Sequence, residues 1–356
     1  MIRTTIDVSP AARARHHAIL DVRSPAEFAE DHLPGAINLP VLDNAERAEV
    51  GTLYVQTSKF LARRLGAARV ARNIATHLET PPLCEQQAGF QPLIYCWRGG
   101  QRSNAMATVL AQVGWPVTLL TGGYKTWRRH VVTALHTADS PLALPPVMLI
   151  EGPTGSGKTA LLSALAAIGQ QTVDLEALAG HRGSLFGATN APQPSQKLWE
   201  SRLLAALEPL DPSRPLFLEA ESSRIGNLAV PPRLWAAMQQ AQRITVNALL
   251  EDRARHTVET YTEIAADRAA LLEAVSRLPR NHSREARARW QSLAEAGDLL
   301  PLAADLMRIH YDPAYARSMA RRPGAPLAEI PLTLTPEGLA QAATRIATLA
   351  VQDVNP

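Results

Sequence analysis

Residues 93–103 read Leu-Ile-Tyr-Cys-Trp-Arg-Gly-Gly-Gln-Arg-Ser, and this stretch decides the fold of the first part of the chain. It begins apolar and β-prone, reaches Cys96, and passes through two glycines to an arginine and a serine. Residues 104–112 then have a helical pattern. The order of strand, loop and helix places the thiol among backbone N–H groups at a helix N-terminus, where amide dipoles and a nearby arginine favour the thiolate. A buried, inert cysteine is the usual alternative, but the two glycines followed by an arginine favour a reactive one.

Strand and helix signals alternate on both sides of this stretch. Residues 19–20 and 116–120 are short apolar strand segments, and residues 32–40 indicate a turn leading into another short strand. Helical patterns cover residues 25–28, 47–54, 59–77 and 124–127, the first opened by Ser24 and Glu27 in a capping-box pattern. The alternation predicts a small parallel α/β domain over residues 1–136, with the cysteine loop at the carboxyl ends of its strands.

Four separated motifs in this domain resemble those of a rhodanese. They are residues 21–28 (Asp-Val-Arg with Glu-Phe), residues 32–38 (His-Leu-Pro-Gly-Ala-Ile-Asn), the Cys96 loop, and residues 122–127 (Gly-Gly-Tyr with Trp). The resemblance implies that the cysteine carries sulfur or selenium as a persulfide or perselenide.

The loop departs from many rhodaneses in its length. Arg102 stands six residues after Cys96, whereas the loop arginine of many rhodaneses stands five residues after the cysteine. A wider loop offers more N–H groups to a tetrahedral anion, so it favours phosphate or selenophosphate over a bare sulfur. Because cysteine phosphatases share the Cys-x5-Arg spacing, a phosphatase is the competing interpretation of this domain.

A second motif opens the rest of the chain. Residues 137–146 contain Pro-Pro just before an apolar strand at 147–151 and are predicted to be a linker. A complete G-x-x-x-x-G-K-T follows, and then an apolar helix over residues 160–168. This is the strand–loop–helix context of a P-loop, which predicts a P-loop domain over residues 147–356. The predicted phosphate-binding residues are Gly152, Thr154, Gly155, Ser156, Gly157, Lys158 and Thr159.

Two acidic segments are candidates for Mg²⁺ or substrate binding. Residues 172–176 are expected to be a strand that carries Asp174 and Glu176 at its end. Residues 216–221 are an apolar strand that ends in Glu219 and Glu221, as a Walker-B segment would. A capped strand end with solvated acids is an equally frequent outcome for Glu219 or Glu221 taken singly. No metal-ligand spacing occurs in the sequence, so no structural metal is expected.

The C-terminal part is helical and rich in arginine. Residues 253–320 have a helical pattern, and residues 330–334 and 336–351 are predicted to be a last strand and a last helix. Arg253 and Arg255 follow a strand at 244–250, where P-loop kinases can supply lid arginines, and a solvated helix start is an equally frequent outcome. Five arginines between 277 and 289 precede Trp290, a combination that suits RNA stacking, although a charged surface helix is the default interpretation.

The composition limits the possible classes. The 356 residues suggest two domains, and 46% hydrophobic with 19% charged residues is ordinary for a globular protein. Cys84 and Cys96 are the two cysteines, which favours a reducing cytoplasm over a disulfide framework. No apolar run is long enough to span a membrane, and no signal peptide is recognisable. A pI near 9.0, carried by arginine, is compatible with RNA binding.

Taken together, the two halves resemble the tRNA 2-selenouridine synthase family. The resemblance is carried by residues 43–54, 95–103, 154–159, 174–184, 193–197 and 219–222. It implies that sulfur in wobble 2-thiouridine of tRNA is replaced by selenium from selenophosphate, through an S-geranylated intermediate made from geranyl diphosphate. Cys96 would carry selenium, with Arg98 and Arg102 binding phosphate, and the P-loop would hold the leaving diphosphate.

The same resemblance implies the partners and excludes others. We expect tRNA and a selenophosphate-producing enzyme as partners, no membrane, and no bound organic cofactor. Two alternatives remain open at this point: a cysteine phosphatase with an attached nucleotide-binding domain, and an ATP-dependent sulfurtransferase or RNA kinase. Residues 174–184 and 193–197 are not ordinary kinase features and favour the synthase.

Overall fold

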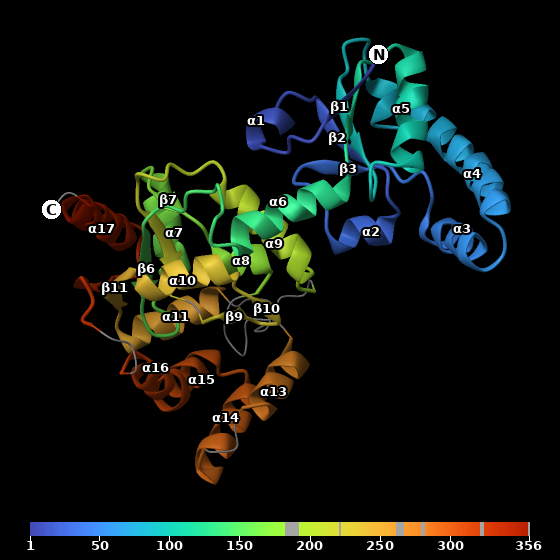
Figure 1. Cartoon of the computed structure of the whole chain (residues 1–356). Helices are drawn as coiled ribbons and strands as arrows, with labels where there is room; N and C mark the ends of the chain where they lie inside the picture. The colour runs from blue at the N-terminus through green and yellow to red at the C-terminus, as the bar shows by residue number, and fades with distance from the viewer. Residues whose placement is uncertain (182–191, 221, 261–266, 279–281, 321–323, 355–356) are drawn as a thin grey trace. The chain divides into compact units, whose positions relative to one another are not determined.

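The computed structural model describes residues 1–181, 192–220, 222–260, 267–278, 282–320 and 324–354. The chain forms two compact units (Figure 1). The first unit comprises residues 1–142 with 194–209, and the second comprises residues 143–193 with 210–356.

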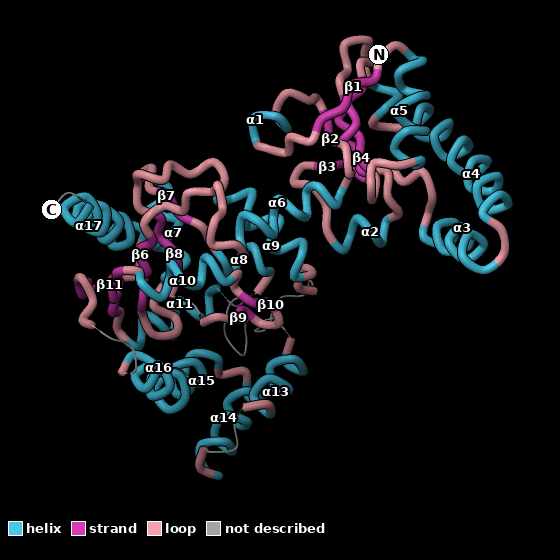
Figure 2. The backbone as a smooth tube through the Cα atoms, viewed as in Figure 1, coloured by secondary structure: helices cyan, strands magenta, loops and turns pink. Residues whose placement is uncertain are grey.

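A five-stranded parallel sheet is the centre of the first unit, with the strand order β1-β5-β4-β2-β3 (Figure 2). Its strands are β1 (Ile2–Thr5), β2 (Ala18–Asp21), β3 (Ala36–Asn38), β4 (Pro92–Tyr95) and β5 (Val117–Leu120). Strand β4 lies in the middle and is buried along its whole length. Strand β4 is therefore held on both sides by neighbouring strands up to the point where the chain leaves the sheet.

Helices surround this sheet. They are α1 (Pro10–Arg13), α2 (Pro25–Glu30), α3 (Asn44–Gln56), α4 (Lys59–Glu79), η1 (Leu83–Glu85), α5 (Gln101–Val113), α6 (Tyr124–His136) and α9 (Gln196–Leu207). Apolar residues of α4 and α5, among them Ile74, Met106 and Leu110, join Leu20 and Ile94 of the strands in one core. The capping box expected at Ser24 and Glu27 opens α2.

The main difference from the predicted domain limits concerns helix α9. Residues 194–209 were predicted to lie in the second domain, but they belong to the first unit. Ser201 of α9 accepts a hydrogen bond from the buried Trp127 at 3.0 Å. Glu200 forms ion pairs with Arg128 and with His136 of α6. Buried carboxylates need such partners, and these partners lie in the first unit.

The second unit has its own five-stranded parallel sheet, with the order β12-β11-β6-β8-β7. The strands are β6 (Val147–Glu151), β7 (Gln171–Thr172), β8 (Leu216–Glu219), β11 (Gln242–Asn247) and β12 (Ala328–Pro331), and a separate hairpin joins β9 (Arg224–Ile225) to β10 (Leu228–Ala229). Helices α7 (Lys158–Ala167), α8 (Leu175–Ala179), α10 (Pro232–Gln240) and α17 (Pro336–Val354) accompany the sheet. Leu161 of α7 and Ile346 of α17 share a core with Ile150, Phe217 and Ile244.

A helical subdomain lies between β11 and β12 in the chain. It contains α11 (Leu250–Thr260), α13 (Arg268–Ser276), α14 (Arg284–Ala296), α15 (Leu299–Leu306), the π-helical turn η2 (Met307–Tyr311) and α16 (Asp312–Met319). Its core is built around the fully buried Trp290. No helix within the described ranges is long and apolar enough to cross a membrane.

The predicted fold class is confirmed, since two parallel α/β sheets are followed by a helical C-terminal part. Strand β1 was not predicted, because its exposed residues lack an alternating pattern. The strand expected over residues 172–176 was wrong: β7 ends at Thr172, and Asp174 caps helix α8. The hairpin of β9 and β10 was also unforeseen.

Candidate active-site loops

Cys96 follows β4 directly and lies in the loop before α5. The backbone N–H of Gly100 and the hydroxyl of Ser103 each donate a hydrogen bond to Sγ at 3.2 Å. Cys96 is 3% exposed, so bulk water does not compete with these two donors for the sulfur. The thiol is thus held in a ring of donors at the N-terminus of α5.

This environment changes the acidity of the thiol. Burial raises the pKa of Cys96, but the Ser103 hydroxyl and the backbone N–H groups of Ser103, Gly100 and Arg98 lower it more. The net pKa lies below the ordinary value of a cysteine. Because the thiolate is the nucleophilic form, the loop favours the reactive state of this residue.

The Gly122-Gly123 motif supports the loop from the end of β5. The backbone N–H of Tyr124 donates to the carbonyl of Cys96 at 2.8 Å. Gly123 has a positive φ of 59°, and a Cβ at this position would lie 2.2 Å from the Cys96 carbonyl oxygen. Only glycine therefore allows α6 to begin so close to the cysteine loop.

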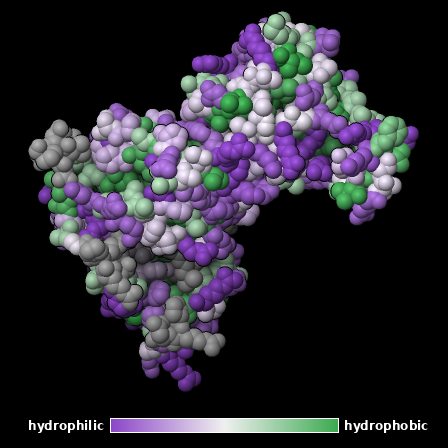
Figure 3. All heavy atoms as spheres, viewed as in Figure 1, coloured by the Kyte–Doolittle hydropathy of each residue, from purple (hydrophilic) through white to green (hydrophobic). Residues whose placement is uncertain are grey.

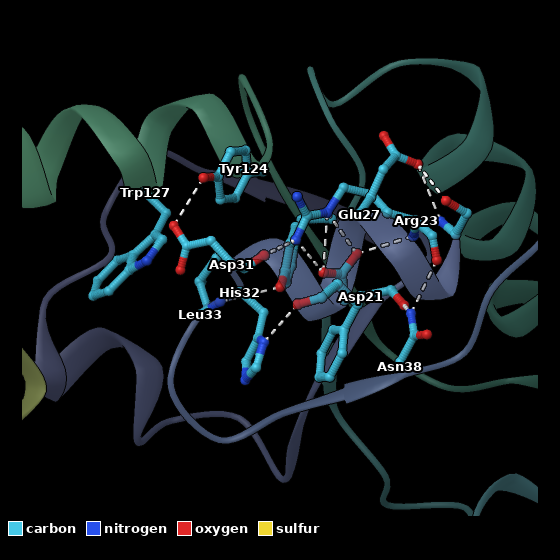
Figure 4. A network of polar contacts seen from close by, with 12 residues as sticks. Asp21, Arg23, Glu27, Asp31, His32, Leu33, Asn38, Tyr124 and Trp127 are labelled. Carbon is cyan, nitrogen blue, oxygen red and sulfur yellow. Dashed lines mark hydrogen bonds and ion pairs between the residues drawn. The ribbon is translucent and has the colours of Figure 1, made fainter. Parts of the chain in front are cut away.

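A buried polar network fixes the carboxyl end of strand β2 (Figure 4). Arg23 forms an ion pair with Asp21 at 2.6 Å, and both side chains are at most 1% exposed. Its guanidinium also donates to the carbonyl of Asp31 and lies 4.2 Å from the ring centre of Tyr124. Tyr124 donates to Asp31 at 2.8 Å. The Asp-Val-Arg motif thus has a structural role, because it ties β2 to the beginning of α6.

The two arginines predicted to bind phosphate have different surroundings. Arg98 is exposed on the cysteine loop. Arg102 donates to both carboxylate oxygens of Glu27, at 2.6 and 3.2 Å. Burial raises the pKa of Glu27, but the hydrogen bonds and the charge of Arg102 lower it by more. The net pKa lies below the ordinary value of a glutamate, so the carboxylate stays charged. Glu27 therefore orients Arg102 at the start of α5.

In the second unit the predicted P-loop joins β6 to α7. Gly155 and Gly157 have φ of 79° and 72°, so the loop turns through conformations that favour glycine. Lys158 Nζ donates to the carbonyl of Gly152 at 3.1 Å. The hydroxyl of Ser156 is buried in the loop and has no hydrogen-bond partner within the described residues. A phosphate oxygen would satisfy this donor.

Thr159 and Glu219 come together at the edge of this loop. The Thr159 hydroxyl donates to Glu219 Oε1 at 2.6 Å, and Glu219 is 2% exposed at the end of β8. A hydroxyl beside a carboxylate is the arrangement that P-loop proteins use for Mg²⁺. These two residues fit that ion, which would neutralise phosphate charge there.

Arg253 supports the P-loop from α11. It donates to the carbonyl of Thr154 at 3.1 Å and forms a bidentate ion pair with Asp312, at 2.8 and 2.6 Å. Because it is only 4% exposed, Arg253 is a buried support of the loop and not a lid arginine. Arg255 is exposed and pairs with Asp252 at 3.4 Å.

Two of the remaining predicted residues, Asp174 and Glu176, belong to the start of helix α8. Asp174 accepts a hydrogen bond from the Ala177 backbone at 2.8 Å as the cap of α8, and Glu176 lies in the first turn of that helix. Glu221 lies outside the described residues, as do Arg182, Gly183, Ser184 and Arg280. Trp290 is fully buried and donates to Asp305 at 3.1 Å, so this ring offers no surface for RNA stacking, and the exposed Arg284 and Arg287 agree with the default interpretation of a charged surface helix.

Two residues of the cysteine loop's surroundings were missed as site residues. Ser103 was part of the quoted stretch, and its position seven residues after the cysteine, in the first turn of α5, is the signal that could have identified it. Glu27 was recognised for its capping box and as part of a rhodanese-like motif, but its contact with Arg102 spans 75 residues, which leaves no local signal.

These loops define an enzyme class in which a rhodanese-type domain is joined to a P-loop domain. Residues 9–130 match the family described as Rhodanese-like domain, and residues 145–276 match the one described as tRNA 2-selenouridine synthase AAA domain. Psychromonas ingrahamii has a tRNA 2-selenouridine synthase that is 33% identical over 254 residues, covering 71% of this chain and 67% of that protein. The chain belongs to the tRNA 2-selenouridine synthase family.

Other curated relatives agree with this assignment. The tRNA 2-selenouridine synthase of Nitrosomonas europaea is 36% identical over 246 residues, and that of Hahella chejuensis is 38% identical over 247 residues. Each alignment covers 68% of this chain and 63% of the relative. The chain thus spans somewhat less than two thirds of the length of these two relatives.

Proposed function

We propose that this protein is a tRNA 2-selenouridine synthase, a selenotransferase that converts wobble 2-thiouridine to 2-selenouridine with selenophosphate through an S-geranylated intermediate. Family membership supports the class of reaction. The observation that carries the division of labour is that one chain holds both a cysteine in an anion-binding loop and a separate P-loop.

In this proposal the P-loop serves the geranylation step. The sulfur of 2-thiouridine attacks the first carbon of geranyl diphosphate, an S–C bond forms, and the C–O bond to diphosphate breaks. Lys158, the loop N–H groups and Ser156 would stabilise the charge that develops on the departing diphosphate. Mg²⁺ held by Thr159 and Glu219 would supply further neutralisation of that charge.

Cys96 serves the selenium step. S-alkylation makes the base sulfur a leaving group, so selenium can bond to C2 while the C2–S bond breaks and geranylthiol departs. The lowered pKa of Cys96 and the N–H groups around it suit an anionic, phosphate-bearing donor. Arg98 and Arg102 would hold the phosphate oxygens.

That Cys96 carries selenium as a perselenide stays a prediction. Selenium in selenophosphate is at the oxidation level of selenide, so joining it to a thiolate as a perselenide also requires a two-electron acceptor. Attack by the selenium of selenophosphate on C2, followed by attack of water on phosphorus that breaks the Se–P bond and releases phosphate, requires none. We therefore propose that the selenium step requires Cys96 whether or not a perselenide forms.

The partners follow from this function. We propose tRNA with a wobble 2-thiouridine as the substrate, a selenophosphate-producing enzyme as the supplier, and the cytoplasm as the compartment. The test is to incubate the protein with 2-thiouridine tRNA, geranyl diphosphate and selenophosphate, and to analyse the wobble nucleoside by mass spectrometry. Appearance of S-geranyl-2-thiouridine and then 2-selenouridine is expected. Release of phosphate from an aryl phosphate, or RNA-dependent ATP turnover without either nucleoside, would instead favour a phosphatase or a kinase.

A further inference from the structure

The first unit contains a cavity that the reaction above does not yet use. Its volume is about 570 Å³, within the range of small-molecule sites. Helices α3 and α4 and the first turns of α5 line it. Most of the lining is apolar and includes Leu42, Val50, Tyr54, Ala62 and Val70.

Helix α3 is packed in an unusual way around this cavity. It lies along α4 but has no buried residue, although it carries Val50, Tyr54 and Val55. Val55 is 82% exposed and Phe60 is 71% exposed where α3 turns into α4. Figure 3 shows hydrophobic side chains at this end of the unit, at the right of the view, among hydrophilic ones. Such exposed apolar surface marks a binding site more often than a free surface.

Arginines accompany the apolar lining. Arg47 on α3 and Arg63 on α4 both line the cavity and are exposed. Neither forms a hydrogen bond or ion pair with a carboxylate in the part of the chain that the structure describes, although the charge of Arg47 lowers the pKa of Glu27. Arg102 also lines it, but its charge is balanced by Glu27. An apolar hollow bordered by two exposed arginines fits a ligand that is both hydrophobic and anionic.

The cavity adjoins the cysteine loop. Gln101, Arg102 and Ala105 of α5 line it. Ser103, in the same turn of the helix, donates to Cys96 Sγ. One helical turn therefore both holds the thiol and forms a wall of the cavity.

We propose that this cavity binds the geranyl chain of S-geranyl-2-thiouridine in the RNA during the selenium step, while Arg47 and Arg63 bind phosphates of the same RNA. This proposal rests on the proposed function. When the C2–Se bond forms and the C2–S bond breaks, the sulfur leaves with the electron pair, takes a proton, and remains attached to a chain already seated in apolar surroundings. Removing this chain from water favours the complex.

The test compares the binding of two anticodon stem-loop RNAs, one with S-geranyl-2-thiouridine and one with S-methyl-2-thiouridine, by fluorescence anisotropy with the full chain. We expect the geranylated RNA to bind roughly 10-fold more tightly. Ala67→Trp fills the cavity from an exposed position of α4 and is expected to abolish this difference. Ala68→Trp, its exposed neighbour outside the lining, should preserve it.

Arg63→Gln provides a second, independent measurement. It should weaken both RNAs by the same factor and reduce the salt dependence of binding, because it removes a phosphate contact and not an apolar one. Equal binding of the two RNAs by the unchanged protein, or an unchanged preference in a folded Ala67→Trp variant, would overturn the proposal. A change of oligomeric state in Ala67→Trp, with the preference for geranylated RNA intact, would also overturn the proposal. It would identify the cavity as an interface between copies of this chain.

Failure here is distinguishable from failure of the proposed function. Loss of geranyl preference in Ala67→Trp concerns binding alone and is measured without selenophosphate. Absence of 2-selenouridine from the complete reaction would instead reject the function, whatever the two RNAs bind.

Discussion

The cysteine loop and the P-loop solve the same problem in different ways. Each connects the end of a central parallel strand to the N-terminus of a helix, and each needs glycine at positive φ. In the first loop the donors converge on Cys96 Sγ, a group that can form a covalent bond. In the second, the functional side chains are Lys158 and Thr159 in the first turn of the helix. The difference teaches that one type of anion-binding turn becomes a nucleophile site or a phosphate clamp according to what occupies it.

Replacing the Cys96 thiol should give the largest effect. Cys96→Ser is expected to reduce 2-selenouridine formation by about 10³-fold or more, since a serine hydroxyl stays protonated at neutral pH. Geranylation should continue, so S-geranyl-2-thiouridine should accumulate in the nucleoside analysis. Loss of both products would mean that the two loops do not divide the work.

The reciprocal change is Lys158→Ala. Removing one cation from the developing diphosphate charge should slow geranylation by about 10²-fold. Selenation of RNA that already carries the geranyl group serves as the control and should proceed at the normal rate. A variant that is equally slow on this pre-geranylated RNA would contradict the assignment of the P-loop.

The support of the cysteine loop is tested by Gly123→Ala. Its Cβ would collide with the Cys96 carbonyl, and the residue would be strained at positive φ, so we expect a loss of about 3 kcal/mol of stability. Gly35→Ala is the matched control, because Gly35 has φ 76° with open space around it, and strain alone should cost about 1 kcal/mol. The urea midpoint of the full chain measures both. Equal midpoints would show that the loop relaxes away from β5.

The smallest effect is expected from Ser103→Ala. Without its hydroxyl, the pKa of Cys96 should rise, so the thiolate fraction near neutral pH should fall. Alkylation by iodoacetamide, measured against pH in a Cys84→Ser background because Cys84 is exposed, should reach half its maximum at higher pH. Ser103→Thr should restore the original profile. A midpoint that stays in place or moves to lower pH would exclude Ser103 as a donor that matters.

Local chain order explains which features were predictable. The Cys96 loop and the P-loop are each contained in about ten consecutive residues, so glycine spacing and strand–helix order are visible in the sequence. Asp174 was misjudged because an acid after a short β-prone segment can end a strand or cap a helix, and here it caps α8.

Contacts between distant segments were not predictable in this way. Arg102 pairs with Glu27 across 75 residues, and the pairing of β1 with β5 brings Ile2 beside Val117. Trp290 next to several arginines suggested a stacking surface, but the helix turns that ring inward and leaves Arg284 and Arg287 exposed. Sequence proximity to charge says little about the direction of an aromatic side chain.

The assignment of α9 to the first unit has a consequence for how this chain is made. Trp127, Arg128 and His136 find their buried partners, Ser201 and Glu200, on a helix that is synthesised about 70 residues later. Ribosomal synthesis would therefore expose a nearly finished first unit that lacks its last helix until residue 209 has left the exit tunnel. Ending a shortened protein at the linker removes that helix, so a separately folding first unit requires residues 194–209 to be joined back to it.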